Sequence, residues 1–166
     1  MHPAELPVEQ LMIGCSFKPT RSRGPGGQHR NKVETAVVIV HRATGIRGAA
    51  SERRSQHQNR QLALFRLRLQ LALEIRSERD PDDCPSQLWR DRTRGSRIVI
   101  NGDHVDFPAM LAELLDVLHT HDLDFKAAAA QLASTASQLM RLLKRQPAAW
   151  QQVGRQRSER GLRPLR

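Results

Sequence analysis

The residues best suited to chemistry lie in one short segment, positions 21–32, which reads Arg-Ser-Arg-Gly-Pro-Gly-Gly-Gln-His-Arg-Asn-Lys. Three glycines and a proline at positions 24–27 cannot continue a helix or a strand. We therefore expect an exposed loop whose bare backbone can come very close to a ligand. The basic side chains around it are Arg21, Arg23, His29, Arg30 and Lys32. Such a loop could approach a phosphate-rich centre, and an ordinary surface loop of a basic protein is the alternative interpretation.

The charge of the whole chain favours a polyanionic partner. Its 166 residues include 27 Lys and Arg against 17 Asp and Glu, which gives a net charge of +10. A charge of this size on a small protein indicates nucleic acid. Aromatic residues make up only 4% of the chain, so recognition through rows of stacked rings is not expected.

The hydropathy pattern predicts a soluble, cytoplasmic protein without a membrane partner. The longest apolar run covers residues 36–40, far below the roughly 20 residues of a membrane span. The first dozen residues contain no Lys or Arg, unlike a signal or transit peptide. Cys15 and Cys84 are too far apart for a zinc knuckle and too few for a disulfide scaffold, so we expect plain thiols and no metal.

Three segments resemble the class I peptide-chain release factor superfamily. Residues 22–32, followed by Thr35-Ala-Val, are similar to the Gly-Gly-Gln (GGQ) signature of that family. The sequence His-Arg-Ala-Thr-Gly-Ile at 41–46 resembles the family's turn between strands. The sequence Glu-Arg-Arg-Ser-Gln-His-Gln-Asn-Arg-Gln-Leu-Ala at 52–63 resembles its second motif. Two motifs in the right order and spacing make the resemblance specific over about residues 10–77.

The resemblance implies ribosome-dependent hydrolysis of the ester between a nascent peptide and its tRNA. Gly26 and Gly27 would keep the tip of the loop narrow enough to enter the peptidyl transferase centre. In the family, the glutamine N–H stabilises the developing oxyanion or the leaving oxygen, and its side chain limits the nucleophile to water; both roles map onto Gln28. Positioning and RNA groups would supply the rest of catalysis, with no cofactor.

The implied partners are the ribosome, through large-subunit rRNA, and peptidyl-tRNA, bound by a monomer. The residues expected to contact RNA are the basic and polar side chains of the two motifs and of the C-terminal tail. They are Arg21, Arg23, Arg30, Lys32, Arg53, Arg54, Gln56, Arg60, Arg155, Arg157 and Arg160. For the tail, a solvated basic end is the alternative interpretation.

Two departures from the family pattern refine this expectation. Only about 20 residues precede the loop here, whereas full-length release factors carry a stop-codon-reading domain before the GGQ domain. The chain is therefore more similar to stand-alone rescue hydrolases, which act without a codon on stalled ribosomes or on separated large subunits. The sequence leaves the choice between these two targets open. Arg30 is the second departure, because many relatives have an apolar residue there.

The elements that must position the motifs predict an α+β fold. Residues 1–80 would form a GGQ peptidyl-tRNA hydrolase domain, in which a short β-sheet packs on a long helix. Its expected elements are strands at 33–41 and 46–50, joined by a turn at 43–45, and a helix over 55–77. Residues 86–166 would form a mainly helical C-terminal domain with a basic tail, after a Pro- and Asp-rich break. Its expected elements are a hairpin at Asn101-Gly102 and helices over 108–119, 124–133, 135–145 and 147 to about 161.

The second half also supports a function of another class. Residues 126–143 resemble a helix-turn-helix, whose groove-reading side chains would be Gln138, Arg141 and Lys144. The chain would then be a non-catalytic RNA- or DNA-binding module. We favour a structural helical hairpin, because the helix face carries few cations, and the intact Gly-Gly-Gln triplet favours the hydrolase.

The remaining candidates are expected to be structural. A cluster of two His and two Asp is typical of a solvated helix cap rather than a metal site, and both tryptophans are expected in the core or at an interface. These residues are His119, His121, Asp122, Asp124, Trp89 and Trp150.

Overall fold

The computed structural model describes residues 1–20 and 35–165. The glycine-rich loop with its surrounding cations, including Arg21, Arg23, Arg30 and Lys32, lies outside the described residues. The chain divides into two compact units. Unit 1 contains Met1 and Pro3–Glu74, and unit 2 contains His2 and Ile75–Arg166. A small sheet with a long helix in unit 1 and a mostly helical unit 2 confirm the predicted fold class.

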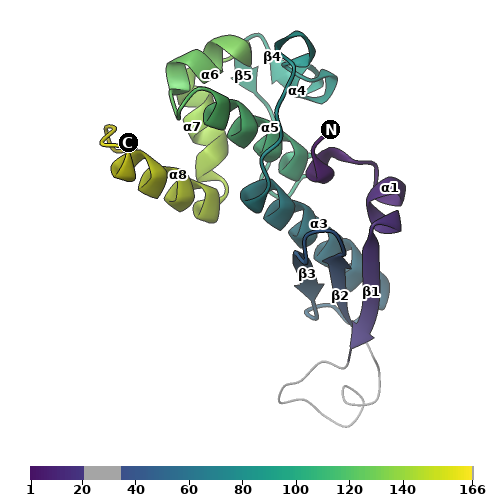
Figure 1. The fold of residues 1–166 in the computed structure, drawn as a ribbon. Coiled ribbons are helices and arrows are strands. Elements are labelled where there is room, and N and C mark those ends of the chain that lie inside the picture. Colours follow the sequence, from purple (N-terminus) through teal and green to yellow (C-terminus); the bar gives the residue numbers. More distant parts are fainter. Residues whose placement is uncertain (21–34, 166) are drawn as a thin grey trace. The chain divides into compact units, whose positions relative to one another are not determined.

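Unit 1 is a three-stranded antiparallel sheet with one long helix against it (Figure 1). The strand order is β1-β2-β3, and β1 pairs with β2 from Cys15 opposite His41 to Thr20 opposite Ala36. The elements in chain order are η1 (Pro3–Glu5), α1 (Val8–Ile13), β1 (Cys15–Thr20), β2 (Ala36–His41), β3 (Arg47–Ala50) and α3 (Gln56–Glu74).

The local sequence explains most of these elements. The β-branched run of β2 favours an extended backbone, and Gly45 supplies the positive φ of +73° that the turn into β3 requires. The predicted strands, turn and long helix are thus confirmed, within a few residues at their ends. α1 and β1 were not predicted.

The core of unit 1 lies between the sheet and α3. Val37 and Ile39 of β2 are fully buried, as are Ala63, Leu67 and Leu71 of α3. β3 approaches α3 so closely at Gly48 that a Cβ atom there would lie 2.1 Å from the carbonyl oxygen of Ala63. Glycine is therefore required by the packing of β3 on the helix backbone.

Unit 2 is built around α5, in which every residue from Phe107 to Leu118 is buried. The surrounding helices begin at capping residues that the sequence shows: Asp124 accepts from the N–H of Lys126, and Thr135 accepts from that of Gln138. The elements are η2 (Pro81–Asp83), α4 (Gln87–Asp91), β4 (Thr93–Arg94), β5 (Arg97–Ile98), α5 (Phe107–Thr120), α6 (Phe125–Gln131), α7 (Ala136–Lys144) and α8 (Pro147–Glu159).

The prediction of a hairpin at Asn101-Gly102 is wrong. The hairpin of this region is β4–β5, and its turn contains Gly95 with φ +58°. The N–H of His104 donates to the carbonyl of Asn101 in a turn that leads into α5 instead. Neither Asn101 nor Gly102 has the positive φ that a two-residue hairpin turn requires, and the residues after them enter a helix rather than a strand.

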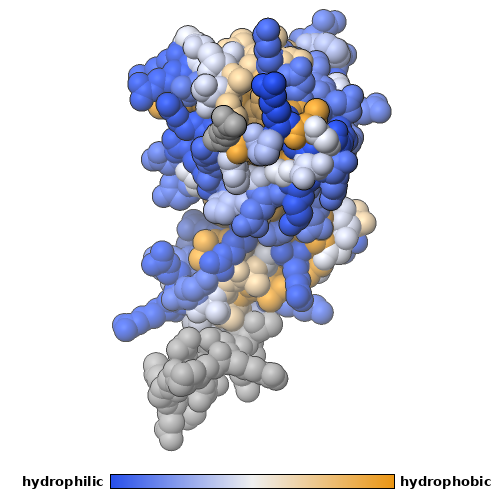
Figure 2. All heavy atoms as spheres, turned by 90° about the vertical axis from the view of Figure 1, so that its left-hand side faces the viewer, coloured by the Kyte–Doolittle hydropathy of each residue, from blue (hydrophilic) through white to orange (hydrophobic). Residues whose placement is uncertain are grey.

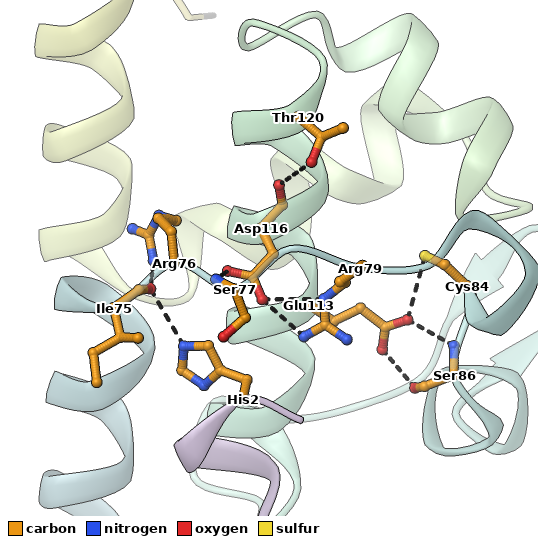
Figure 3. A network of polar contacts seen from close by, with 10 residues as sticks. All are labelled: His2, Ile75, Arg76, Ser77, Arg79, Cys84, Ser86, Glu113, Asp116 and Thr120. Carbon is orange, nitrogen blue, oxygen red and sulfur yellow. Dashed lines mark hydrogen bonds and ion pairs between the residues drawn. The ribbon is translucent and has the colours of Figure 1, made fainter.

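A buried carboxylate of α5 anchors the chain just after α3. Oδ1 of Asp116 accepts from the N–H of Ser77 at 3.1 Å, and Oδ2 pairs with Nη2 of Arg79 at 3.0 Å (Figure 3). Burial raises the pKa of Asp116, while the Ser77 N–H and the Arg79 charge act in the opposite direction. The ion pair and the hydrogen bond therefore offset part of the cost of burying the charge.

A second buried carboxylate, one turn earlier on α5, anchors the Pro- and Asp-rich break. Oε1 of Glu113 accepts from the N–H of Ser86 at 2.7 Å, and Oε2 accepts from its hydroxyl (Figure 3). Burial raises the pKa of the neighbouring Cys84 thiol to about 11, and the Glu113 charge adds to this effect. The break is therefore fixed within unit 2, and Cys84 is a buried, protonated thiol near neutral pH, as expected.

The surface is predominantly polar on the face that Figure 2 shows, where apolar side chains gather in small areas between hydrophilic ones. Within residues 1–20 and 35–165, no helix has the length and hydropathy needed to cross a lipid bilayer.

Candidate functional site

The predicted catalytic residues Gly26, Gly27 and Gln28 belong to the segment that connects β1 to β2. They lie outside the described residues, so their roles stay predictions. The structure does describe where that segment joins the sheet. Thr20 and Ala36 are paired, so the connection leaves and re-enters the sheet at the same end.

A buried amide holds the point where this connection ends. The side chain of Asn59, in the first turn of α3, has no exposed surface. Its Nδ2 donates to the carbonyl of Thr35 at 2.7 Å and to that of Arg53 at 2.8 Å. Its Oδ1 accepts from the N–H of Arg53 at 2.9 Å. One side chain thus joins the start of β2 to the segment that leads into α3. Asn59 lies inside the second motif, but nothing in the sequence distinguishes it from the other residues there.

Four predicted RNA-binding residues lie together next to this amide. Arg53 and Arg54 are exposed just before α3, and Gln56 and Arg60 are exposed in its first turns. The Arg60 guanidinium lies 5.4 Å from the ring centroid of Phe17 on β1, a cation–π contact. We call Arg53, Arg54, Gln56 and Arg60 the basic segment. It combines exposed cations with a backbone that Asn59 holds in place.

An ion pair fixes the other end of the turn between β3 and α3. Arg66 of α3 pairs with the Glu52 carboxylate and also donates to the carbonyl of Ala49 at 2.7 Å. The hydrogen bond from Arg66, followed by that from the Ser51 N–H, lowers the pKa of Glu52 to about 2. The turn is therefore held at Glu52 as well as at Arg53.

We expect Glu52→Gln to weaken unit 1 slightly and in a pH-dependent way. The pKa of Glu52 in the fold lies below its ordinary value of 4.5, so the ion pair stabilises above that pH, and the stabilisation is lost as the pH falls towards 2. Because the pair is half exposed, its contribution at pH 7 should be at most about 1 kcal/mol. Urea unfolding of the wild type and of Glu52→Gln at pH 7, 4 and 2.5 measures the difference in free energy of unfolding. A difference in free energy of unfolding that stays constant over this range would contradict the prediction.

The predicted residues of the tail lie in unit 2, on the last turns of α8 and just after it. Arg155 is exposed. Arg157 is half-buried: its guanidinium donates to the carbonyls of Arg163 and Leu123. Arg160 forms an ion pair with Asp122 at 2.9 Å. Helix α8 ends at Glu159, before the rest of the tail, as predicted. Arg157 and Arg160 therefore have partners within the fold, and their contact with RNA stays a prediction.

The helix-turn-helix interpretation gains little from the geometry. α6 and α7 form a helical hairpin, but Oε1 of Gln138 accepts from the N–H of Ile98 at 3.3 Å. The ammonium group of Lys144 lies 4.8 Å from the ring centroid of Trp150. Of the three predicted groove-reading residues, these two have partners inside unit 2, whereas Arg141 is exposed. These contacts favour the structural hairpin.

The remaining candidates have structural surroundings. Trp89 is 1% exposed and its indole N–H donates to the carbonyl of Leu132 at 3.0 Å, as expected for a core residue. Nε2 of His121 lies 2.6 Å from Oε1 of Gln131, and Asp124 caps α6. In the described part of the chain, no group of three or more His, Cys, Asp or Glu could hold a metal ion.

Comparison with known proteins finds a matching family and similar proteins for about half of the chain. Residues 12–97 match the family described as "RF-1 domain". The chain is 38% identical over 96 residues to peptide chain release factor 1 of Xylella fastidiosa, covering 58% of this chain and 23% of that protein. It is 47% identical over 75 residues to the chloroplastic peptide chain release factor PrfB1 of Arabidopsis thaliana, covering 45% of this chain and 16% of that protein. The chain thus spans at most about a quarter of the length of these relatives. No solved structure matches it significantly.

Proposed function

The chain belongs to the RF-1 domain family, and from this membership we propose that it hydrolyses the ester of peptidyl-tRNA on the ribosome. Its relatives are peptide chain release factors by name. The observation that carries the proposal is the β1–β2 pairing, which brings both ends of the segment with Gly26, Gly27 and Gln28 to one end of the sheet. A segment anchored in this way can present a single tip to a partner.

In the proposed reaction, water attacks the ester carbonyl within the large subunit. The backbone N–H of Gln28 stabilises the negative charge that develops on oxygen, a donor effect that does not require a base or a metal. The two glycines before it leave room for rRNA around the tip. The ribosome supplies the substrate and the remaining positioning, so the free protein is expected to be nearly inert.

We assign residues 1–80 to the hydrolase domain and residues 86–166 to a helical domain with a basic tail. The units support a boundary in this region, since unit 1 ends at Glu74 and unit 2, apart from His2, begins at Ile75. The basic segment, together with the cations of the loop, is assigned to rRNA contact because it exposes charge beside the start of β2. The tail arginines are assigned to a second contact.

We further propose that release is independent of a stop codon, as in rescue of stalled ribosomes or large subunits. Residues 1–20 form η1, α1 and β1 of unit 1 itself. Residues 75–165 form a helical unit around α5. We assign no codon-reading role to residues 1–20 or to residues 75–165.

Single-turnover peptide release tests this function. The substrates are ribosomes stalled on mRNA without a stop codon, ribosomes with a stop codon in the decoding site, and large subunits that carry peptidyl-tRNA. We expect release from a stalled or split substrate at a rate that a stop codon does not raise. Release that requires a stop codon would overturn the rescue assignment, and no release from any substrate would overturn the hydrolase assignment.

Ribosome binding is expected to be strongly salt-dependent. If the protein neutralises about four phosphates, affinity should fall about 100-fold between 50 and 200 mM monovalent salt, because counterions compete with the arginines. Equilibrium binding at fixed Mg²⁺ measures the slope. The double change Arg53→Gln and Arg54→Gln should reduce the magnitude of this slope by about 2. Arg94→Gln, which changes an exposed arginine of β4 in unit 2, should leave the slope unchanged. A flat salt dependence would exclude electrostatic docking.

A further inference from the structure

We propose that Asn59 is a positioning residue for peptide release, because its buried amide sets the basic segment against the start of β2. The inference rests on the proposed function. Neither the motif comparison nor the charge pattern gives this residue a role, since it is uncharged and has no exposed surface.

The hydrogen-bonding capacity of Asn59 is matched to its surroundings. An amide has two N–H donors, and these reach the carbonyls of Thr35 and Arg53. Its oxygen accepts from the N–H of Arg53. The reverse orientation would point the oxygen at two carbonyls, so the contacts fix which way the amide faces. No other uncharged side chain of this length supplies two donors and an acceptor.

The location of these contacts connects two parts of the proposed function. Thr35 directly precedes β2, at the end of the connection that carries Gln28. Arg53 begins the basic segment, and both of its backbone polar groups are held by Asn59. The side chain therefore determines where one end of the connection lies relative to cations assigned to rRNA. A shift of about 1 Å in such a geometry can lower a rate about 100-fold without removing any binding group.

The test uses the full chain and two substitutions. Asn59→Asp keeps the acceptor but faces two carbonyls with a carboxylate, and Asn59→Ala removes the amide without adding charge. Gln58→Glu and Gln58→Ala are the matched controls, because Gln58 is the exposed neighbour on the same helix. The measurements are the ribosome dissociation constant and the release rate constant at saturating protein, with thermal melting used to express each rate per folded molecule.

We expect both Asn59 variants to lower the saturating release rate by about 10- to 100-fold, with the dissociation constant within about threefold of its matched control. A wild-type rate per folded molecule in either variant would overturn the inference. So would an equal loss of affinity and rate that follows the folded fraction, since that result describes stability alone. If Asn59→Asp does not fold, Asn59→Ala carries the test.

Amide hydrogen exchange separates failure of this inference from failure of the proposed function. In the wild-type chain the Arg53 N–H should be protected, and Asn59→Ala should accelerate its exchange at least 10-fold while the Ile39 N–H in the centre of the sheet is unchanged. No release by the wild type would overturn the proposed function. An unprotected Arg53 N–H, or one unaffected by Asn59→Ala, would overturn the positioning role whether or not peptide is released.

Discussion

Replacing Gln28 by proline is expected to lower the rate of peptide release by about 100- to 1000-fold, with ribosome affinity within about threefold. Proline has no N–H, so the donor assigned to the developing oxyanion disappears. Loss of one such donor typically costs this much in rate. Affinity should persist because it resides in the arginines rather than in the tip. Single-turnover release at saturating protein, with binding measured in parallel, gives both quantities.

The side chain of Gln28 is tested separately from its N–H. Gln28→Ala keeps the donor and opens space, so the variant should lose discrimination against nucleophiles larger than water. Hydroxylamine added to the release reaction is expected to compete with water in this variant but not in the wild type. Gln58→Ala removes the same side chain from an exposed site and serves as control. A near wild-type rate in Gln28→Pro would overturn the catalytic assignment and favour the binding-module alternative.

Elements whose cause is local could be predicted from the sequence. The long helix is the clearest case, because residues 67–75 alternate apolar and polar types as a strand would. The helix-forming residue types and the lack of Gly or Pro nevertheless predict a helix, and the structure contains α3 there. The later helices α6 and α7 also begin within one residue of the predicted starts at 124 and 135, where the Asp124 and Thr135 side chains cap them.

Elements that depend on a distant partner could not be predicted. β1 contains Lys18 and Pro19, which weaken any strand pattern, yet it pairs along its full length with β2. Proline is tolerated there because β1 is the edge strand of the sheet that the described residues form. The hairpin of unit 2 could not be placed for a different reason: β4 and β5 have two residues each, too few for a periodic signal.

The residues of the candidate site also fall into two groups: those whose role follows from residue type and those whose role depends on distant partners. The loop triplet and the arginines of the basic segment are visible as sequence motifs, because their chemistry depends on residue type. The role of Asn59 depends on two carbonyls, 24 and 6 residues away along the chain. Its only sequence signal was its place in the second motif. The contacts of Arg157 to the carbonyls of Leu123 and Arg163 likewise depend on the fold and could not be predicted from its charge, while its contact with RNA stays a prediction.

The close approach of β3 to α3 at Gly48 leads to the largest expected change in stability. A Cβ atom on residue 48 would lie 2.1 Å from the carbonyl oxygen of Ala63 and 2.4 Å from the backbone nitrogen of Leu67. Both atoms belong to the helix backbone, so side-chain rotation cannot relieve the overlap. Gly48→Ala must therefore displace β3 or α3, and we expect it to lower the free energy of unfolding of unit 1 by about 3 kcal/mol or more.

Gly154→Ala is the matched control, because it adds the same methyl group to a glycine inside α8 with nothing within 4 Å of the new atom. This change should stabilise unit 2 by about 0.5–1 kcal/mol, since alanine is the better helix former. Urea dependence of amide exchange at Ile39 reports on unit 1, and tryptophan fluorescence reports on unit 2, where both tryptophans lie. If Gly48→Ala changes the stability of unit 1 by less than 1 kcal/mol, β3 does not lie against the α3 backbone. The β2–β3 register that aligns Gly48 with Ile39 would then also be wrong.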